Sequence, residues 1–503
     1  MPVRKYTLCM VLGFLLFFQP WHTLAAGRPF DFNERCRQAY SYLMMLKLDE
    51  GLKLLDQEKQ EHPENLAPYF LDNYADFFRM FFHEDAAEYA KLKNNRDIRL
   101  NLMAQGDKQS PFYLYTQAML HFQWAASRIK FGERWSAVWE FRRAYLLMKE
   151  NNDKFPHFTP NKMLLGAMQT VIGTVPESYR WITSILGLSG GSISRGMQLL
   201  QSYVNDGSEQ GTLFKEEAYF YYAYLKFYIE HKPDEVFRFI QEKNLDLVNN
   251  KLNAFMAANL AINNHMGDYG LKILNNMKSG PAYLDMPIID YEMGVLKLNH
   301  LELGDATHYL KSFLDRFKGK FYVKDALLKL SRAYYLQGNR PLAEKYLAEI
   351  QSRGNAETDA DKVALREMKK KQWPNATILS ARFLSDGGYF EEALHILTAQ
   401  KVENFPDPLD KIEYAYFLAR IYDELEQDDH AIPLYEVTIK AASSRPEYFA
   451  ARAAMQLGFI YEQRKDTARA IEYFKKCISM PEEEYKSTLD QRAKAGINRL
   501  TVK

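Results

Sequence analysis

Apolar and polar residues recur along most of the chain with the period of amphipathic helices. In the second half, short side chains recur roughly every 34 to 39 residues, with one longer interval, and each is followed four positions later by an apolar residue. These short residues are Val236, Gly270, Ala306, Ala343, Ala393, Ala431 and Ala470. Most have a small residue twelve positions earlier: Ala258, Gly294, Ser331, Ala381, Ala419 and Gly458. Small residues let two helices approach closely, so the pattern predicts about seven consecutive helical hairpins from roughly 217 to the end.

The first half of the chain follows this pattern less regularly. Ala39, Gly51 and Pro63 fit one hairpin at about 34–64, and residues 112–148 fit a longer one. Prolines and glycines interrupt the segment 156–200. We therefore expect an irregular helical region at 27–215, followed by a repeat array at 216–503.

The longer interval in the array holds an insertion at about 352–372. Its central part is rich in Asp, Glu and Lys. The simplest interpretation is an extra solvated helix between two repeats.

Composition agrees with a helical fold. Among 503 residues there are only 25 Gly and 19 Pro, whereas 14% are aromatic. This combination is typical of long helices that pack through large side chains, and it disfavours sandwiches and barrels. The net charge of +1 excludes a general electrostatic attraction to nucleic acid or to an anionic membrane, although a local patch is compatible with it.

The N-terminus has the features of a secretory signal peptide. Arg4 and Lys5 precede an apolar run from Leu8 to Phe18, and small residues follow at Ala25. The run is shorter than the ~20 residues that span a bilayer, so a cleaved signal at 1–26 is favoured over a membrane anchor. The remaining chain holds only two cysteines, at opposite ends, and no disulfide framework. We expect a periplasmic or otherwise exported protein of a bacterial cell envelope, with peripheral association to the envelope left open.

A signature near the C-terminus identifies the repeat. Leu457-Gly458 is followed by Tyr461, Ala470, Phe474 and Pro481. In this order, the stretch 454–481 resembles the tetratricopeptide repeat (TPR) family. The resemblance implies an all-α, right-handed α-solenoid whose concave groove binds a protein or peptide segment.

A second likeness covers residues 118–200. A hairpin rich in Trp and Phe is followed by a Gly-Thr-Val-Pro turn at 173–176 and a Leu-Gly-x-x-Gly sequence. This order resembles a eukaryotic family of TPR proteins linked to inclusion-body clearance. We assign no activity to this chain from that likeness.

The TPR resemblance also aligns three arginines. In that family the ninth position of the first helix usually faces the groove, and here it is occupied by Arg332, Arg382 and Arg420 in three consecutive hairpins. Guanidinium groups bind carboxylates through two parallel hydrogen bonds, so these residues are candidates for partner binding. The alternative is that they form ordinary ion pairs between repeats, with acids such as Asp325, Asp386, Glu413 or Asp423.

Other candidate chemistry is weaker. The aromatic run 219–224 fits either a stacking platform for sugars and peptides or packing on both sides of a helix. The loop from Gly187 to Gly191 lacks the Lys-Ser or Lys-Thr of a phosphate-binding loop, which favours a structural turn. No motif for a zinc site or a nucleophilic hydrolase occurs. We expect no metal, no cofactor and no catalytic residues.

These features predict a non-catalytic scaffold of the cell envelope. One alternative is a glycan-binding module of a nutrient-uptake system. Another is a hydrolase whose site lies in 156–200 and converges on His157, Glu177 or Arg180.

Overall fold

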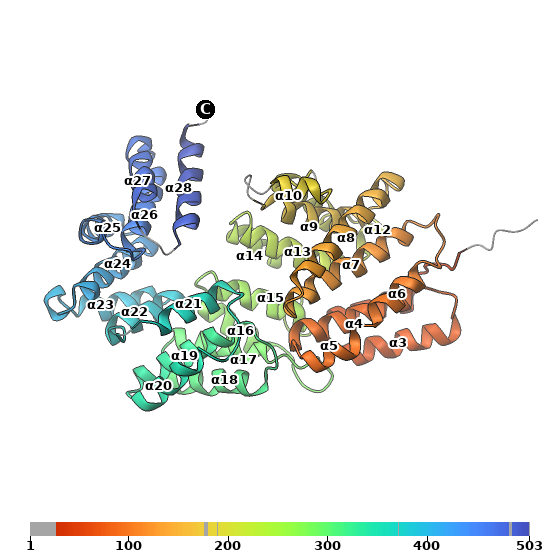
Figure 1. The fold of residues 1–503 in the computed structure, drawn as a ribbon, viewed down its shortest axis with the longest axis horizontal. Helices are drawn as coiled ribbons and strands as arrows, with labels where there is room; N and C mark the ends of the chain where they lie inside the picture. Colours follow the sequence, from red (N-terminus) through yellow and green to blue (C-terminus); the bar gives the residue numbers. More distant parts are fainter. Residues whose placement is uncertain (1–26, 176–179, 189, 371, 482–484, 502–503) are drawn as a thin grey trace, which may run out of the picture. The chain divides into compact units, whose positions relative to one another are not determined.

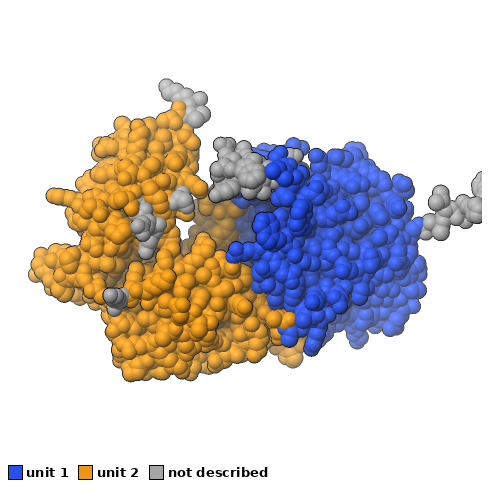
Figure 2. Space-filling model, viewed as in Figure 1, with its two compact units in different colours: residues 1–81, 87–225 blue, residues 82–86, 226–503 orange. Residues whose placement is uncertain are grey.

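The computed structural model describes residues 27–175, 180–188, 190–370, 372–481 and 485–501, and all regular elements within these ranges are helical (Figure 1). The predicted all-α fold is therefore confirmed. The chain forms two compact units, which Figure 2 shows in different colours. Unit 1 comprises the residues up to 81 and 87–225, and unit 2 comprises 82–86 and the residues from 226 onwards.

Two predictions concern the membrane and the N-terminus. The expected signal peptide at 1–26 lies outside the described residues. In the part of the chain that the structure describes, no helix combines the length and the apolar character needed to cross a bilayer.

Unit 1 contains hairpins that are less regular than those of unit 2. Its helices are α2 (Glu34–Met44), α3 (Leu48–Glu61), α4 (Ala67–His83), α5 (Ala86–Leu92), α6 (Asn95–Met103), α7 (Phe112–Lys130), α8 (Arg134–Lys154), α9 (Asn161–Gly173), α10 (Arg180–Ile185), α11 (Ile193–Val204), α12 (Glu209–Thr212) and α13 (Lys215–Tyr228), of which α4 and α13 end, and α5 begins, in residues of unit 2. The pair α2–α3 forms the hairpin predicted at about 34–64. There, a Cβ atom on Gly51 would lie 2.8 Å from the Leu43 side chain, so glycine allows the close approach.

The aromatic core of unit 1 encloses the carboxyl group of Glu217. Phe214 stacks on Tyr115, with ring centroids 5.4 Å apart. Beside them, Glu217 of α13 is 5% exposed and accepts hydrogen bonds from Tyr74 at 2.7 Å and Tyr221 at 2.5 Å. Burial raises the pKa of Glu217 to about 7, against the opposing effect of these hydrogen bonds.

Unit 2 is an α-solenoid in which helical hairpins follow one another (Figure 1). Its elements are α14 (Pro233–Glu242), α15 (Lys251–Ile262), α16 (Gly267–Asn276), α17 (Ile288–Asn299), α18 (Leu303–Arg316), α19 (Val323–Leu336), α20 (Arg340–Glu349), α21 (Asp359–Met368), α22 (Ala376–Gly387), α23 (Phe390–Thr398), the short 3₁₀ helix η2 (Val402–Asn404), α24 (Pro408–Glu424), α25 (Asp428–Ala442), α26 (Phe449–Gln463), α27 (Thr467–Ser479) and α28 (Lys486–Thr501). The hairpin pairs are α15–α16, α17–α18, α19–α20, α22–α23, α24–α25 and α26–α27.

The repeat register predicted from the small residues is confirmed in these hairpins. Ala470 of α27 is fully buried, and a Cβ atom on Gly458 of α26 would lie 2.5 Å from the Phe474 ring. In α19–α20, the buried Ser331 donates a 2.7 Å hydrogen bond to the carbonyl oxygen of Ala343. Close contact through small residues therefore sets the geometry of each hairpin.

The insertion forms α21, which packs against α19. The expectation of a solvated helix is wrong for one face of it, because Asp361 and Ala364 are fully buried. The Asp361 carboxylate accepts hydrogen bonds from the backbone N–H groups of Tyr322, Lys324 and Asp325, at 2.8, 3.0 and 3.1 Å. These N–H groups have no partner within α19, so α21 supplies the N-terminal cap of a helix in the array.

Candidate functional site

The three predicted arginines line two adjoining pockets of unit 2. Arg332 and Arg382 line the first pocket, of about 340 Å³. Arg382 also lines the second pocket, of about 450 Å³, together with Arg420. We call these two pockets together the arginine groove; its lining residues come from helices between α15 and α28. The structure thus brings the three arginines together, whereas their role in binding stays a prediction.

The repeat register explains their position. Each arginine directly follows a buried small residue, Ser331, Ala381 or Ala419, at which its helix meets its hairpin neighbour. One residue further along a helix turns the side chain by about 100°, away from that contact. The exposed fractions of the side chains are 7% for Arg332, 41% for Arg382 and 18% for Arg420.

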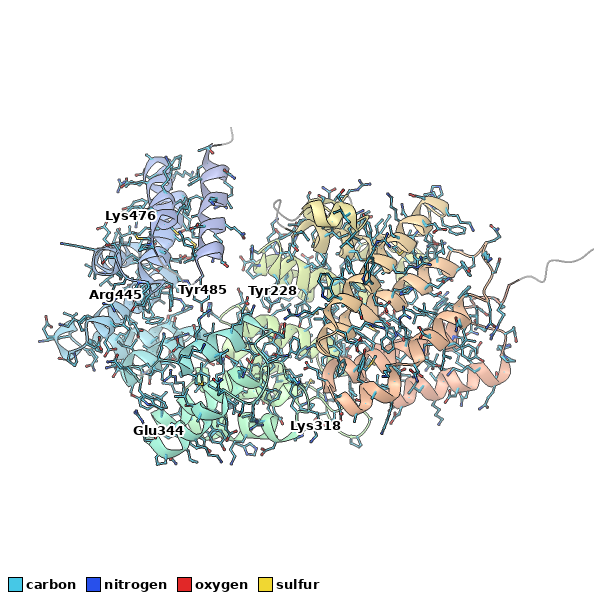
Figure 3. All side chains as sticks on the ribbon, viewed as in Figure 1. Tyr228, Lys318, Glu344, Arg445, Lys476 and Tyr485 are labelled. Atoms are coloured by element: carbon cyan, nitrogen blue, oxygen red, sulfur yellow. The ribbon has the colours of Figure 1, made fainter. Side chains whose placement is uncertain are left out.

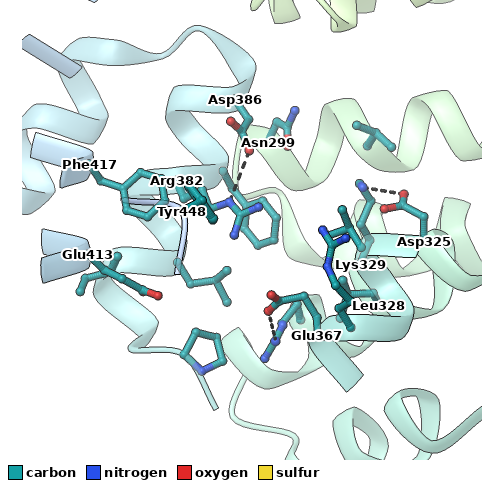
Figure 4. A pocket seen from close by; sticks show the side chains of 18 of the residues that line it. Asn299, Asp325, Leu328, Lys329, Glu367, Arg382, Asp386, Glu413, Phe417 and Tyr448 are labelled. Carbon is teal, nitrogen blue, oxygen red and sulfur yellow. Dashed lines mark hydrogen bonds and ion pairs between the residues drawn. The ribbon is translucent and has the colours of Figure 1, made fainter. Parts of the chain in front are cut away.

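The arginines also form ion pairs. Arg382 lies 3.8 Å from one carboxylate oxygen of Asp386 (Figure 4). Arg420 lies 3.3 Å from the other oxygen of Asp386, and Arg332 lies 3.4 Å from Glu367 of α21. The same side chains therefore line the groove and form the ion pairs that the alternative interpretation expected, while their role in partner binding stays a prediction.

The other acids proposed as partners interact with different groups or, in the case of Glu413, form no ion pair between described residues. Asp325 pairs with Lys329 at 2.5 Å, and Asp423 accepts a hydrogen bond from Tyr435 at 2.9 Å. Glu413 lines the first pocket, where burial raises its pKa to about 7 (Figure 4).

Sequence reasoning missed two arginines of the second pocket, Arg452 of α26 and Arg492 of α28. Neither forms an ion pair with a carboxylate in the described ranges. The Arg452 guanidinium lies 5.1 Å from the ring centroid of Tyr448 and 5.6 Å from that of Tyr485, which precedes α28 (Figure 3). Burial and the nearby charge of Arg452 lower the pKa of Arg492. The two cations thus influence each other, and the described residues supply neither of them with a carboxylate in an ion pair.

The second pocket has an excess of positive charge. Its lining contains four arginines and two carboxylates: Arg382, Arg420, Arg452 and Arg492, and Asp386 and Glu424. Tyr416, Phe417 and Tyr448 supply its aromatic walls. Because partly buried guanidinium groups gain most from charged hydrogen-bond partners, this pocket suits a ligand that carries carboxylates.

Comparison with protein families decides the nature of the repeat. The tetratricopeptide repeat model matches residues 451–484. The chain therefore contains a tetratricopeptide repeat at its C-terminal end. The matched repeat spans most of the hairpin α26–α27 and includes Arg452 of the second pocket.

Solved structures superimpose only loosely on this chain. A monomeric IFIT1 mutant with m7Gppp-AAAA is 13% identical, covers 89% of this chain and 90% of its own, and has a TM-score of 0.35. Yeast Tom70 is 14% identical, the match covers 92% of this chain and 95% of Tom70, and the TM-score is 0.23. The Cut9-Hcn1 hetero-tetramer of the APC/C is 11% identical, the match covers 94% of this chain and 90% of that chain, and the TM-score is 0.28. At these scores none bears on what this chain binds. No curated protein matches the sequence.

The other candidate sites do not assemble in the described residues. The aromatic run 219–224 lies in α13 with none of its six side chains exposed, which favours packing over a stacking platform. Gly187 and Gly190 adopt positive φ angles of 69° and 92°, as expected for a turn. His157 is exposed, while Glu177 and the Arg180 side chain lie outside the described residues. Within those residues, no group of His, Cys, Asp and Glu is arranged to hold a metal ion.

Proposed function

We propose that this TPR protein is a non-catalytic scaffold that binds an acidic segment of another protein in the arginine groove. The observation that carries the proposal is the presence of Arg452 and Arg492 in one pocket, with no ion pair to a carboxylate in the described ranges. Like charges that line one pocket repel each other, and a ligand carboxylate bound between them reduces this repulsion and accepts charged hydrogen bonds.

The lining of the groove favours a peptide over a polyphosphate. Tyr416, Phe417 and Tyr448 offer apolar contacts beside the arginines. Asp386 and Glu367, which also line the groove, would repel a uniformly charged phosphate backbone. A segment in which carboxylate and apolar side chains are mixed satisfies both conditions, and solenoids present concave surfaces of this kind to partners.

The cell-envelope location belongs to the same proposal and is supported by the signal-like N-terminal sequence alone. No observation favours the glycan alternative, since the aromatic run proposed for sugar stacking is packed in α13.

Affinity capture from an envelope extract tests the scaffold role. Arg452→Gln combined with Arg492→Gln breaks no ion pair between the described residues, so the fold is expected to persist. We expect a protein retained by the full chain to be recovered at least tenfold less by this double variant, because each arginine contributes a charged hydrogen bond. Mass spectrometry of the bound fraction measures the loss.

The matched control is Arg464→Gln with Arg499→Gln. These arginines flank or lie on the same helices, α26 and α28, but form surface ion pairs with Asp428 and Glu462 outside the groove. The control is expected to capture the partner fully. Equal capture by the groove variant, or no protein retained by the unmodified chain, would contradict the proposal.

A further inference from the structure

Two tryptophans stand out on the surface of unit 1. Trp135 and Trp139 of α8 are 82% and 57% exposed. They are four residues apart and so project from the same face of the helix, one turn from each other. Tryptophan is mostly buried in folded proteins, and two adjacent exposed rings indicate a surface that meets another apolar phase.

The apolar surface continues onto a neighbouring segment. Arg142 of α8 donates a 2.7 Å hydrogen bond from Nε to the carbonyl oxygen of Leu186, and its guanidinium lies 5.7 Å from the Trp139 ring. Ile185, next to Leu186, is 74% exposed. We call Trp135, Trp139, Arg142, Arg143 and Ile185 the tryptophan face.

The exposed charged side chains near the two tryptophans of α8 are basic. Between Arg134 and Lys149 the sequence contains a single acid, Glu140. Glu140 is 5% exposed and points into unit 1, where it lies 2.6 Å from Arg96 and 2.5 Å from His121. The exposed charged groups within about one turn of the tryptophans are therefore basic, namely Arg134 and Arg143, whereas the exposed acids of α8, Glu150 and Asp153, lie further along the helix.

This combination matches the headgroup layer of an anionic bilayer. Tryptophan rings prefer the boundary between headgroups and acyl chains, and arginine side chains reach from there to the phosphates. Each basic residue near an anionic surface adds about 1 kcal/mol of attraction. The opposite face of α8 is held in the protein, since Ala144 and Met148 are fully buried. Such a helix can lie in the plane of the membrane surface without crossing it.

We propose that the tryptophan face docks unit 1 on an anionic lipid bilayer as a peripheral membrane contact. The near-neutral total charge does not oppose this, because the attraction is local to α8. The inference is independent of the arginine groove, which lies in unit 2.

Vesicle flotation of the chain that begins at residue 27 tests the proposal. Vesicles of phosphatidylglycerol and phosphatidylethanolamine are the probe, and vesicles of phosphatidylcholine alone are the reference. We expect the protein to float with the anionic vesicles. Trp135→Ser combined with Trp139→Ser should lower its partition coefficient at least tenfold, with an unchanged circular dichroism spectrum.

The matched control is Ile98→Ser with Val437→Ser, which removes two apolar side chains that are 57% and 55% exposed elsewhere on the surface. It should float as well as the unmodified chain. The proposal is overturned if the unmodified chain does not float with anionic vesicles, or if the tryptophan variant floats equally well. A protein partner lost in the tryptophan variant, without vesicle binding, would also overturn it.

Discussion

Replacing Asp361 with alanine is expected to lower the free energy of unfolding of unit 2 by about 3 kcal/mol. The change removes the acceptor of three backbone N–H groups at the start of α19 and of the Thr358 hydroxyl. Buried donors left without a partner are costly, and the loss also separates α21 from the array. Burial raises the pKa of Asp361, so its own desolvation offsets part of the gain.

Hydrogen exchange of individual amides measures this effect where it arises. The amides of Lys324 and Asp325 should exchange at least a hundredfold faster in Asp361→Ala, while Asp361→Asn, which keeps one acceptor oxygen, should give a smaller increase. Asp359→Ala is the control, because that side chain lies two residues away in α21 and is 94% exposed. Unchanged protection of α19 in Asp361→Ala would show that α21 does not cap it.

Glu217→Gln is expected to stabilise unit 1 above neutral pH by about 3 kcal/mol. Burial raises the pKa of Glu217 to about 7 from an ordinary value of 4.5. In the folded chain the carboxyl group therefore keeps its proton to higher pH than in the unfolded chain. Its contribution to stability is intact below about pH 4.5 and declines as the pH rises to about 7. Above that pH, the ionised carboxylate stays buried among Tyr74, Tyr221 and Gln123, and no cationic group of the described residues pairs with it.

Urea unfolding at pH 4.5 and pH 8, followed by the fluorescence of the aromatic core, checks this prediction. The difference between Glu217→Gln and the unmodified chain should be small at the lower pH and large at the higher one. Glu209→Gln provides the control, since the Glu209 side chain is 80% exposed. A difference between variant and unmodified chain that does not change with pH would refute the assignment of the titration to Glu217.

The repeat array was predictable because its signal is local. Ala470 and Phe474 are one turn apart, and Gly458 precedes Ala470 by twelve residues, so a single hairpin carries the whole pattern. The position of Arg332, Arg382 and Arg420 followed from that register. Arg452 was also within reach, because it lies two turns before Phe459, which takes the place of Arg420 in the last repeat.

The remaining features depend on contacts between distant parts of the sequence. Arg492 lies on α28, beyond the last repeat, where no register applies. Asp361 caps residues 36 to 39 positions upstream, which its charged neighbours in the insertion do not reveal. Glu217 meets Tyr74 across 143 residues of an irregular region. Composition and periodicity predict where the helices lie in the sequence, but they do not predict which helices pack against each other.

Calorimetric titration with a defined acidic peptide tests the central claim most directly. A decapeptide that alternates glutamate with leucine (the glutamate peptide) and one that alternates glutamine with leucine, of equal length, are titrated into the chain that begins at residue 27. We predict that only the glutamate peptide binds, that its affinity falls as salt is added, and that Arg452→Gln with Arg492→Gln weakens it at least tenfold. Equal binding of the two peptides, or unchanged binding of the glutamate peptide by the double variant, would contradict recognition of an acidic segment by the arginine groove.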